Sequence, residues 1–179
     1  MIAKLLFVPD MHKRYTDSDS VKGTLKLIQK QQEELISAIQ DNNITHVILG
    51  GDWYDRGFHG LGQAFGQMEM DRRLSAAVNG NCYLCVGNHL YFESDENPEM
   101  YAIQPNDVIQ TALDIPLPET PIFKCVRQLM LGTVQIDFFH YSKTNKEYYR
   151  AVNPGTTFHI GVYHDDKVCP AYVRELEGY

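Results

Sequence analysis

The stretch LGGDWYDRG, residues 49–57, decides the fold, because it sets two aspartates, three glycines and an arginine directly after the apolar run THVIL. A buried strand that ends in an acidic, glycine-rich loop has two interpretations. Glycine and aspartate are common in surface turns for backbone reasons, and paired carboxylates can also bind a ligand. A second polar loop, GNH at residues 87–89, follows another apolar run and weakens the explanation by turns alone.

Composition and charge limit the class of protein. The chain has 179 residues, 44% hydrophobic and 22% charged, which suits a single domain over residues 1–179 with a substantial core. The net charge of −7 argues against a broad basic surface for nucleic acid. A nuclease stays open, because bound divalent metals would reverse the local sign. The start, MIAKLLFVPD, is too short for a membrane span and unlike a signal peptide, so we expect a cytoplasmic protein that binds no membrane.

The cysteine spacing has a structural interpretation and a chemical one. Cys82 and Cys85 form a C-x-x-C pair, a spacing also found in redox and zinc sites. Both lie in the apolar run NCYLCVG, a predicted strand in which positions three apart face opposite sides. We therefore interpret them as core residues in a protein of a reducing compartment.

Apolar runs alternate with helical periodicity, which predicts an α/β fold. Strands are expected at residues 2–8, 44–50, 82–87, 134–139 and 158–163. Helices are expected from about residues 18–20 to 41–43, over residues 60–79 and around residues 107–113. The acidic run YFESDENPEMY, residues 91–101, is interpreted as a solvated loop at the rim of the site.

Metal-capable residues follow five of the predicted strands. In chain order they are Asp10 with His12, Asp52 with Asp55, Asn88 with His89, His140, and His164. Each has an ordinary explanation as a cap, turn or strand end, but ligands of open α/β sheets bind beyond the carboxyl ends of the strands. Carboxylate, imidazole and amide ligands together suit Mn²⁺, Fe²⁺ or Zn²⁺. A carboxylate such as Asp52 can bridge two such ions about 3.5–4 Å apart.

These motifs carry a resemblance to a known family. D-M-H, G-D-W-Y-D-R-G, G-N-H and two later histidines resemble the calcineurin-like metallophosphoesterase superfamily, whose pattern is D-x-H, G-D-x-x-D, G-N-H, a lone His and G-H-x-H. The resemblance implies a metallophosphoesterase-type β-sheet sandwich flanked by helices, with the metal site at the C-terminal ends of the strands. It also implies a metal-dependent phosphoesterase that hydrolyses a phosphate mono- or diester by attack of metal-activated water. Two divalent ions are implied, with Mn²⁺ favoured and Fe²⁺ or Zn²⁺ as alternatives.

The resemblance also implies a role for each residue. One metal would be held by Asp10, His12, Asp52 and His164, and the other by Asp52, Asn88 and His140. His89 would be the general acid, oriented by Asp55, which agrees with the need of a leaving alkoxide for a proton near neutral pH. An alternative role for His89 is to position the substrate.

The chain departs from the family pattern near its end. Val162 stands where G-H-x-H has its first histidine, so the second metal lacks one expected ligand and is expected to bind weakly or only with substrate. In the register that we favour here, His140 is the lone histidine and His164 ends the last motif. In a second register, His164 is the lone histidine and the last motif is absent.

The loop around Asp55 allows further interpretations. D-R-G resembles the protein phosphatases of the superfamily, whose arginine contacts the substrate phosphate, and the guanidinium of Arg56 has the right geometry for this. Arg56 could equally pair with a surface carboxylate. Trp53 and Tyr54 either stack on a base or pack beneath the loop.

The sequence thus favours a phosphoesterase that acts on a small or nucleotide-like phosphate ester. One alternative is a nuclease resembling the catalytic subunit of double-strand-break repair complexes, although the net charge does not favour nucleic acid as the substrate. The other is a non-catalytic interaction domain with a partly lost second metal site. The sequence predicts no oligomeric state.

Overall fold

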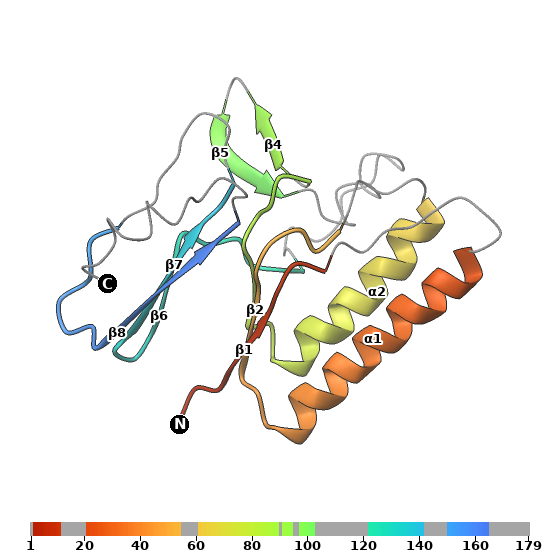
Figure 1. Ribbon diagram of the computed structural model, residues 1–179, viewed down its shortest axis with the longest axis horizontal. Helices are drawn as coiled ribbons and strands as arrows, with labels where there is room; N and C mark the ends of the chain where they lie inside the picture. The colour runs from red at the N-terminus through yellow and green to blue at the C-terminus, as the bar shows by residue number, and fades with distance from the viewer. Residues whose placement is uncertain are drawn as a thin grey trace.

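The computed structural model describes residues 2–11, 21–54, 61–89, 91–94, 97–102, 122–141 and 150–164. Two helices and eight strands lie within these ranges (Figure 1). In chain order they are β1 Leu5–Val8, α1 Val21–Asp41, β2 His46–Leu49, α2 Leu61–Ala77, β3 Cys82–Leu84, β4 Tyr91–Ser94, β5 Asn97–Ala102, β6 Gln128–Leu131, β7 Val134–Phe139 and β8 Phe158–Tyr163.

The first sheet is parallel, in the order β1-β2-β3. Its central strand β2 pairs Leu49 with Val8 on one side and with Leu84 on the other. Both faces of β2 and β3 are covered, which explains why these strands read as continuous apolar runs rather than as alternating patterns.

The second sheet has the order β6-β7-β8 and is mixed. β6 and β7 form an antiparallel hairpin, in which Leu131 pairs with Val134 and Gly132 takes a positive φ of 63° in the turn between them. β7 and β8 run parallel, so that Phe138 pairs with Val162. Strands β4 and β5 form a separate antiparallel pair.

The two helices lie side by side on one side of the first sheet, and the second sheet lies on the other side (Figure 1). Alternate residues of β2 pack on opposite sides of the first sheet, toward the helices and toward the second sheet. Val47 and Leu49 pack in one core cluster with Ile39 of α1 and Leu74 of α2. Ile48 points the other way and belongs to a cluster that joins the two sheets, together with Tyr83, Cys85, Ile136, Phe138 and Val162.

The predicted core role of Cys82 and Cys85 is confirmed. Cys82 packs in the cluster shared with the helices, and Cys85 packs in the cluster between the sheets. Both are buried free thiols, and burial raises the pKa of Cys85 to about 12.

All five predicted strands and the first two predicted helices are confirmed; β7 and β8 have the predicted bounds, and β1, β2 and β3 are shorter than expected. The prediction of a loop over residues 91–101 was wrong, because β4 and β5 form a hairpin there with an irregular register after Phe92. Strand β6 was not predicted, and the helix expected around residues 107–113 lies outside the described residues. None of the helices in the described ranges is long and apolar enough to cross a bilayer.

Candidate metal centre

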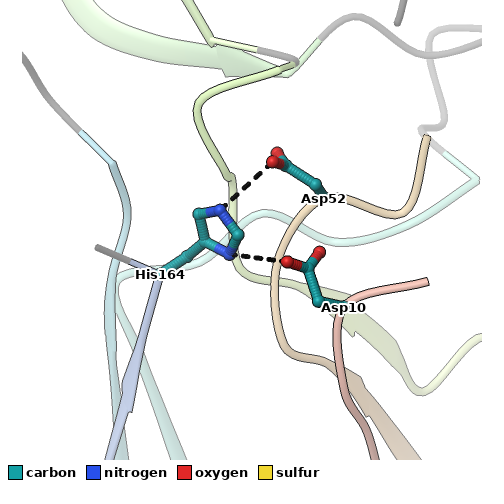
Figure 2. A group of neighbouring side chains, drawn as sticks. All are labelled: Asp10, Asp52 and His164. Atoms are coloured by element: carbon teal, nitrogen blue, oxygen red, sulfur yellow. Dashed lines mark ion pairs between the residues drawn. The ribbon is translucent and has the colours of Figure 1, made fainter. Parts of the chain in front are cut away.

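Three side chains from distant parts of the chain converge at one end of the sheets. Asp10 follows β1, Asp52 follows β2 and His164 follows β8, and one ligand atom from each lies within 4.8 Å of the other two (Figure 2). His164 lies between the two carboxylates, with Nε2 3.2 Å from Oδ2 of Asp52 and Nδ1 3.8 Å from Oδ2 of Asp10. The first sheet thus contributes both acids and the second sheet contributes the imidazole.

Asp52 is the most enclosed member of this cluster, with a side chain only 1% exposed. Its Oδ1 accepts a hydrogen bond of 3.0 Å from the backbone N–H of His89. Within the described residues, its buried Oδ2 has no hydrogen-bond partner of standard geometry and makes only ion pairs, with His164 at 3.2 Å and with His89 at 3.8 Å. A carboxylate oxygen removed from water in this way is costly without a compensating charge, and a cation supplies one.

Two glycines leave the space that this arrangement needs. A Cβ atom at Gly87 would overlap the carboxylate and the backbone nitrogen of Asp52. A Cβ atom at Gly51, where φ is 150°, would overlap the imidazole of His164. The glycines of the G-G-D and G-N-H motifs therefore let loops from β2 and β3 approach one another and the end of β8.

Asn88 and His89 also contact the cluster. Oδ1 of Asn88 lies 3.0 Å from Nε2 of His164, so His164 contacts both Asn88 and Asp52 through the same nitrogen. The side chain of His89 is 29% exposed and lies at the rim, with Nε2 within 3.8 Å of Asp52.

The charges of the cluster support one another. Burial alone would raise the pKa of Asp52, but the close imidazole of His164 and the hydrogen bond from the His89 backbone outweigh it and lower that pKa. The same contact with Asp52 raises the pKa of His164, against the opposing effect of burial, and the charges of Asp52 and Asp10 add to the rise. A proton on His164 thus compensates part of the negative charge of Asp10 and Asp52. The donor set of carboxylates, imidazole and amide oxygen fits a divalent cation in place of that proton.

The family model for calcineurin-like phosphoesterases matches residues 3–160 of the chain. The chain belongs to this family. No curated protein matches it. Membership places the chain among the metal-dependent phosphoesterases, which are hydrolases of phosphate esters. The matched range includes the D-M-H, G-D-W-Y-D and G-N-H motifs and ends just before His164.

In the described part of this phosphoesterase, His140 is not a member of the cluster formed by Asp10, Asp52 and His164. Its Nδ1 accepts a hydrogen bond of 3.0 Å from the N–H of Val86, and its Nε2 donates to the carbonyl of Val126 at 2.9 Å. Burial lowers the pKa of His140 to about 4, with a smaller opposing effect from the Val126 hydrogen bond. Both ring nitrogens are occupied, so this conformation offers none to a metal, and the ligand role of His140 stays a prediction.

Val162 occupies the position where the family pattern has its first terminal histidine. Its side chain is 3% exposed and packs between the sheets with Phe138 and Cys85. This position of β8 therefore faces the core rather than the cluster.

Three predicted site residues, His12, Asp55 and Arg56, lie outside the described residues. Their roles stay predictions. Trp53 and Tyr54 are described and are buried, at 1% and 0% exposure. They pack beneath the loop, as one of the two interpretations had it, and offer no face to a base.

Sequence reasoning missed Asp71, on which Trp53 and Tyr54 converge. Nε1 of Trp53 donates to its Oδ1 at 3.1 Å, and the Tyr54 hydroxyl donates to its Oδ2. A signal was present in the helical spacing, because Asp71 falls on the same buried face of α2 as Gln67 and Leu74. A charged residue within such a face has a specific partner more often than not.

Proposed function

We propose that this chain hydrolyses phosphate mono- or diesters with two divalent cations, of which Mn²⁺ is the first candidate. The observation that carries the proposal is the buried Asp52 carboxylate, whose Oδ2 faces His164 while Asp10 and Asn88 lie against the same imidazole. These residues would hold the cations through carboxylate, imidazole and amide ligands, which are donor types that suit Mn²⁺.

The ligand assignment that we propose differs from the one expected from the sequence. His164 would share a cation with Asp52 and Asn88, since its Nε2 lies 3.2 Å and 3.0 Å from their oxygens. Asp10, Asp52 and the predicted ligand His12 would hold the other. His140 would then be structural, which its two backbone hydrogen bonds favour. In the sandwich that the resemblance implies, this centre would lie at the C-terminal ends of β1, β2, β3 and β8.

The residues of the chain have defined tasks in this reaction. Divalent cations in such a centre activate water for attack on phosphorus and neutralise charge on the phosphate. Asp52 remains ionised at neutral pH because its pKa is lowered. His164 would have to lose its proton to bind a cation, so cation binding would be weaker in acid. His89, partly exposed at the rim, would protonate the leaving oxygen, and its backbone N–H keeps Asp52 in orientation.

The substrate that we propose is small or nucleotide-like. A net charge of −7 disfavours extended contact with a polyanion. Arg56 would contact the phosphate, as the D-R-G resemblance implies. A non-catalytic interaction domain is the second candidate, and the burial of Val162 at an expected ligand position favours it.

Hydrolysis of p-nitrophenyl phosphate and bis(p-nitrophenyl) phosphate, with Mn²⁺ restored after chelation, tests the proposal. We expect Mn²⁺-dependent turnover that Asp52→Asn reduces by at least about 100-fold, since the variant keeps the shape and removes the bridging charge. Asp137→Asn is the matched control, because Asp137 is equally buried but pairs with His159 on β8. Faster hydrolysis of the diester than of the monoester would make nucleotides the next substrates to test. No turnover in folded wild-type protein, with oligonucleotides also tested, would support the interaction domain instead.

A further inference from the structure

Asp71 is another buried carboxylate in the described part of the chain, and it is hydrogen-bonded to the two residues that follow Asp52. Asp71 of α2 is 0% exposed and accepts hydrogen bonds from four side chains. Three donors reach Oδ1: Nε2 of Gln32 at 3.0 Å, Nε1 of Trp53 at 3.1 Å and Nε2 of Gln67 at 2.7 Å. The hydroxyl of Tyr54 donates to Oδ2.

The donors come from three parts of the fold. Gln32 lies on α1, Gln67 lies one turn before Asp71 on α2, and Trp53 and Tyr54 directly follow Asp52. Asp71 thus ties the two helices, which lie side by side in Figure 1, to the loop that carries Asp52. The Trp53 ring also packs edge-on against Phe123, with ring centroids 6.0 Å apart.

Simple packing does not require this arrangement. Burying a carboxylate is costly unless donors satisfy it, and an apolar side chain of similar size would join the helices at lower cost. A satisfied polar network has directional preferences that an apolar contact lacks, so it favours one orientation of the groups that it joins. Here the joined groups are the two residues next to the proposed bridging ligand.

We propose that Asp71 is a positioning residue that fixes residues 52–54 so that the Asp52 carboxylate points toward Asp10 and His164. The inference rests on the proposed function, because the purpose of this orientation is to bind a cation. Asp71 acts through Trp53 and Tyr54 and contacts no substrate.

The experiment compares four variants of the full chain under conditions where each is folded by circular dichroism. Asp71→Ala removes all four hydrogen bonds, and Asp71→Asn keeps an acceptor for Oδ1 partners and can donate to Tyr54. Tyr54→Phe removes one donor and keeps the ring. Leu74→Ala is the control, because Leu74 is equally buried on α2 and packs in the core shared with Trp53 without a hydrogen bond to the loop.

Two readouts are measured for each variant. The first is Mn²⁺ affinity by titration calorimetry. The second is acrylamide quenching of the metal-free protein, which reports directly on the loop because Trp53 is the only tryptophan in the sequence. A purely structural role would lower thermal stability in Asp71→Ala and Leu74→Ala alike, and would change neither readout in the folded protein.

We expect Asp71→Ala to weaken Mn²⁺ binding about 10-fold or more and to expose Trp53 to acrylamide, with Asp71→Asn close to wild type and Leu74→Ala unchanged. If Asp71→Ala does not fold, weaker Mn²⁺ binding by Tyr54→Phe supports the inference, and wild-type binding by Tyr54→Phe overturns it. Equal effects of Asp71→Ala and Leu74→Ala also overturn it. If wild-type protein binds no Mn²⁺, the proposed function fails, and the acrylamide comparison alone decides the role of Asp71.

Discussion

At the scale of single residues, the candidate site depends on glycine at position 87 as well as on the ligand candidates. Gly87 has no Cβ, and Asp52 occupies the space where one would lie. The sequence motif G-N-H shows that glycine is there, but only the approach of the loop from β2 explains why no other residue fits. Sequence reasoning identified the ligand candidates and could not identify this steric requirement, because the two loops are far apart in the chain.

Gly87→Ala should therefore damage the cluster directly. We expect Mn²⁺ affinity to fall at least about 10-fold as Asp52 is displaced, with a loss of about 1–3 kcal/mol in the free energy of unfolding from overpacking. Titration calorimetry and urea unfolding measure the two effects.

Gly66→Ala is the matched control. It lies within α2 and an added Cβ would meet nothing within 4 Å. It should leave metal binding unchanged and raise the free energy of unfolding by about 0.5–1 kcal/mol through helix propensity. Equal metal affinities for the two variants would contradict the close approach of Gly87 to Asp52.

At the scale of secondary-structure elements, His140 connects the end of β7 to the end of β3. Its ring accepts from the Val86 N–H, and the N–H of the next residue, Tyr141, donates to the Val86 carbonyl at 2.8 Å. These bonds hold the backbone just before Gly87, so the two sheets are joined next to the G-N-H loop. The lone-histidine pattern predicts a ligand here, and that role stays a prediction. The backbone partners of His140 could not be predicted, because a motif records the residue type and not the partners that long-range pairing gives it.

This link predicts a pH dependence of stability. The pKa of His140 is about 4 in the folded protein, against an ordinary value of 6.5 that applies after unfolding. The unfolded chain therefore takes up a proton first as the pH falls, so the stability contribution is complete above 6.5 and is lost toward pH 4. Between about pH 7.5 and 4.5, this residue should cost the metal-free protein about 2–3 kcal/mol of unfolding free energy.

The measurement compares wild type with His140→Gln by urea unfolding in chelator at both pH values. Glutamine can accept from Val86 and donate to Val126 without titrating, and the opposite contribution of His164 is present in both proteins. The wild type should lose more stability in acid than the variant. If the free energy of unfolding has the same pH dependence in both proteins, His140 is solvated rather than buried and hydrogen-bonded to Val86 and Val126.

The secondary structure itself was predictable to different extents along the chain. β2 and β3 are buried on both faces, so their apolar runs identify them without any knowledge of their neighbours. β6 is only four residues long and alternates between exposed and partly buried positions, so it depends on pairing with β7 for its identity. The network around Asp71 depends in the same way on three elements that meet only in the folded protein.

At the scale of the whole molecule, the cluster collects negative charge in a chain that is already acidic. Asp10 and Asp52 face the same imidazole, and the net charge of the chain is −7. The cations proposed for this centre would together join β1, β2, β3 and β8, and only the folded state would bind them. Mn²⁺ at about 100 times its dissociation constant should thus stabilise the protein by about 2.7 kcal/mol, or about 5–10 °C in Tm.

Thermal unfolding with chelator and with Mn²⁺ measures this shift, and Asp52→Asn should abolish most of it. The control is Mg²⁺ at the same concentration, which prefers waters and oxygen ligands over imidazole and should stabilise the protein less. A shift that survives in Asp52→Asn would locate the bound metal elsewhere on the surface.

The order in which the ligands occur along the chain has a consequence for protein synthesis. Asp10 and Asp52 leave the ribosome early, whereas His164 follows the last described strand, β8. At about 5–20 residues per second, several seconds separate the second aspartate from the histidine. During that interval the nascent chain holds an acidic pair without its imidazole, so we expect the cluster to assemble only after translation has passed residue 164.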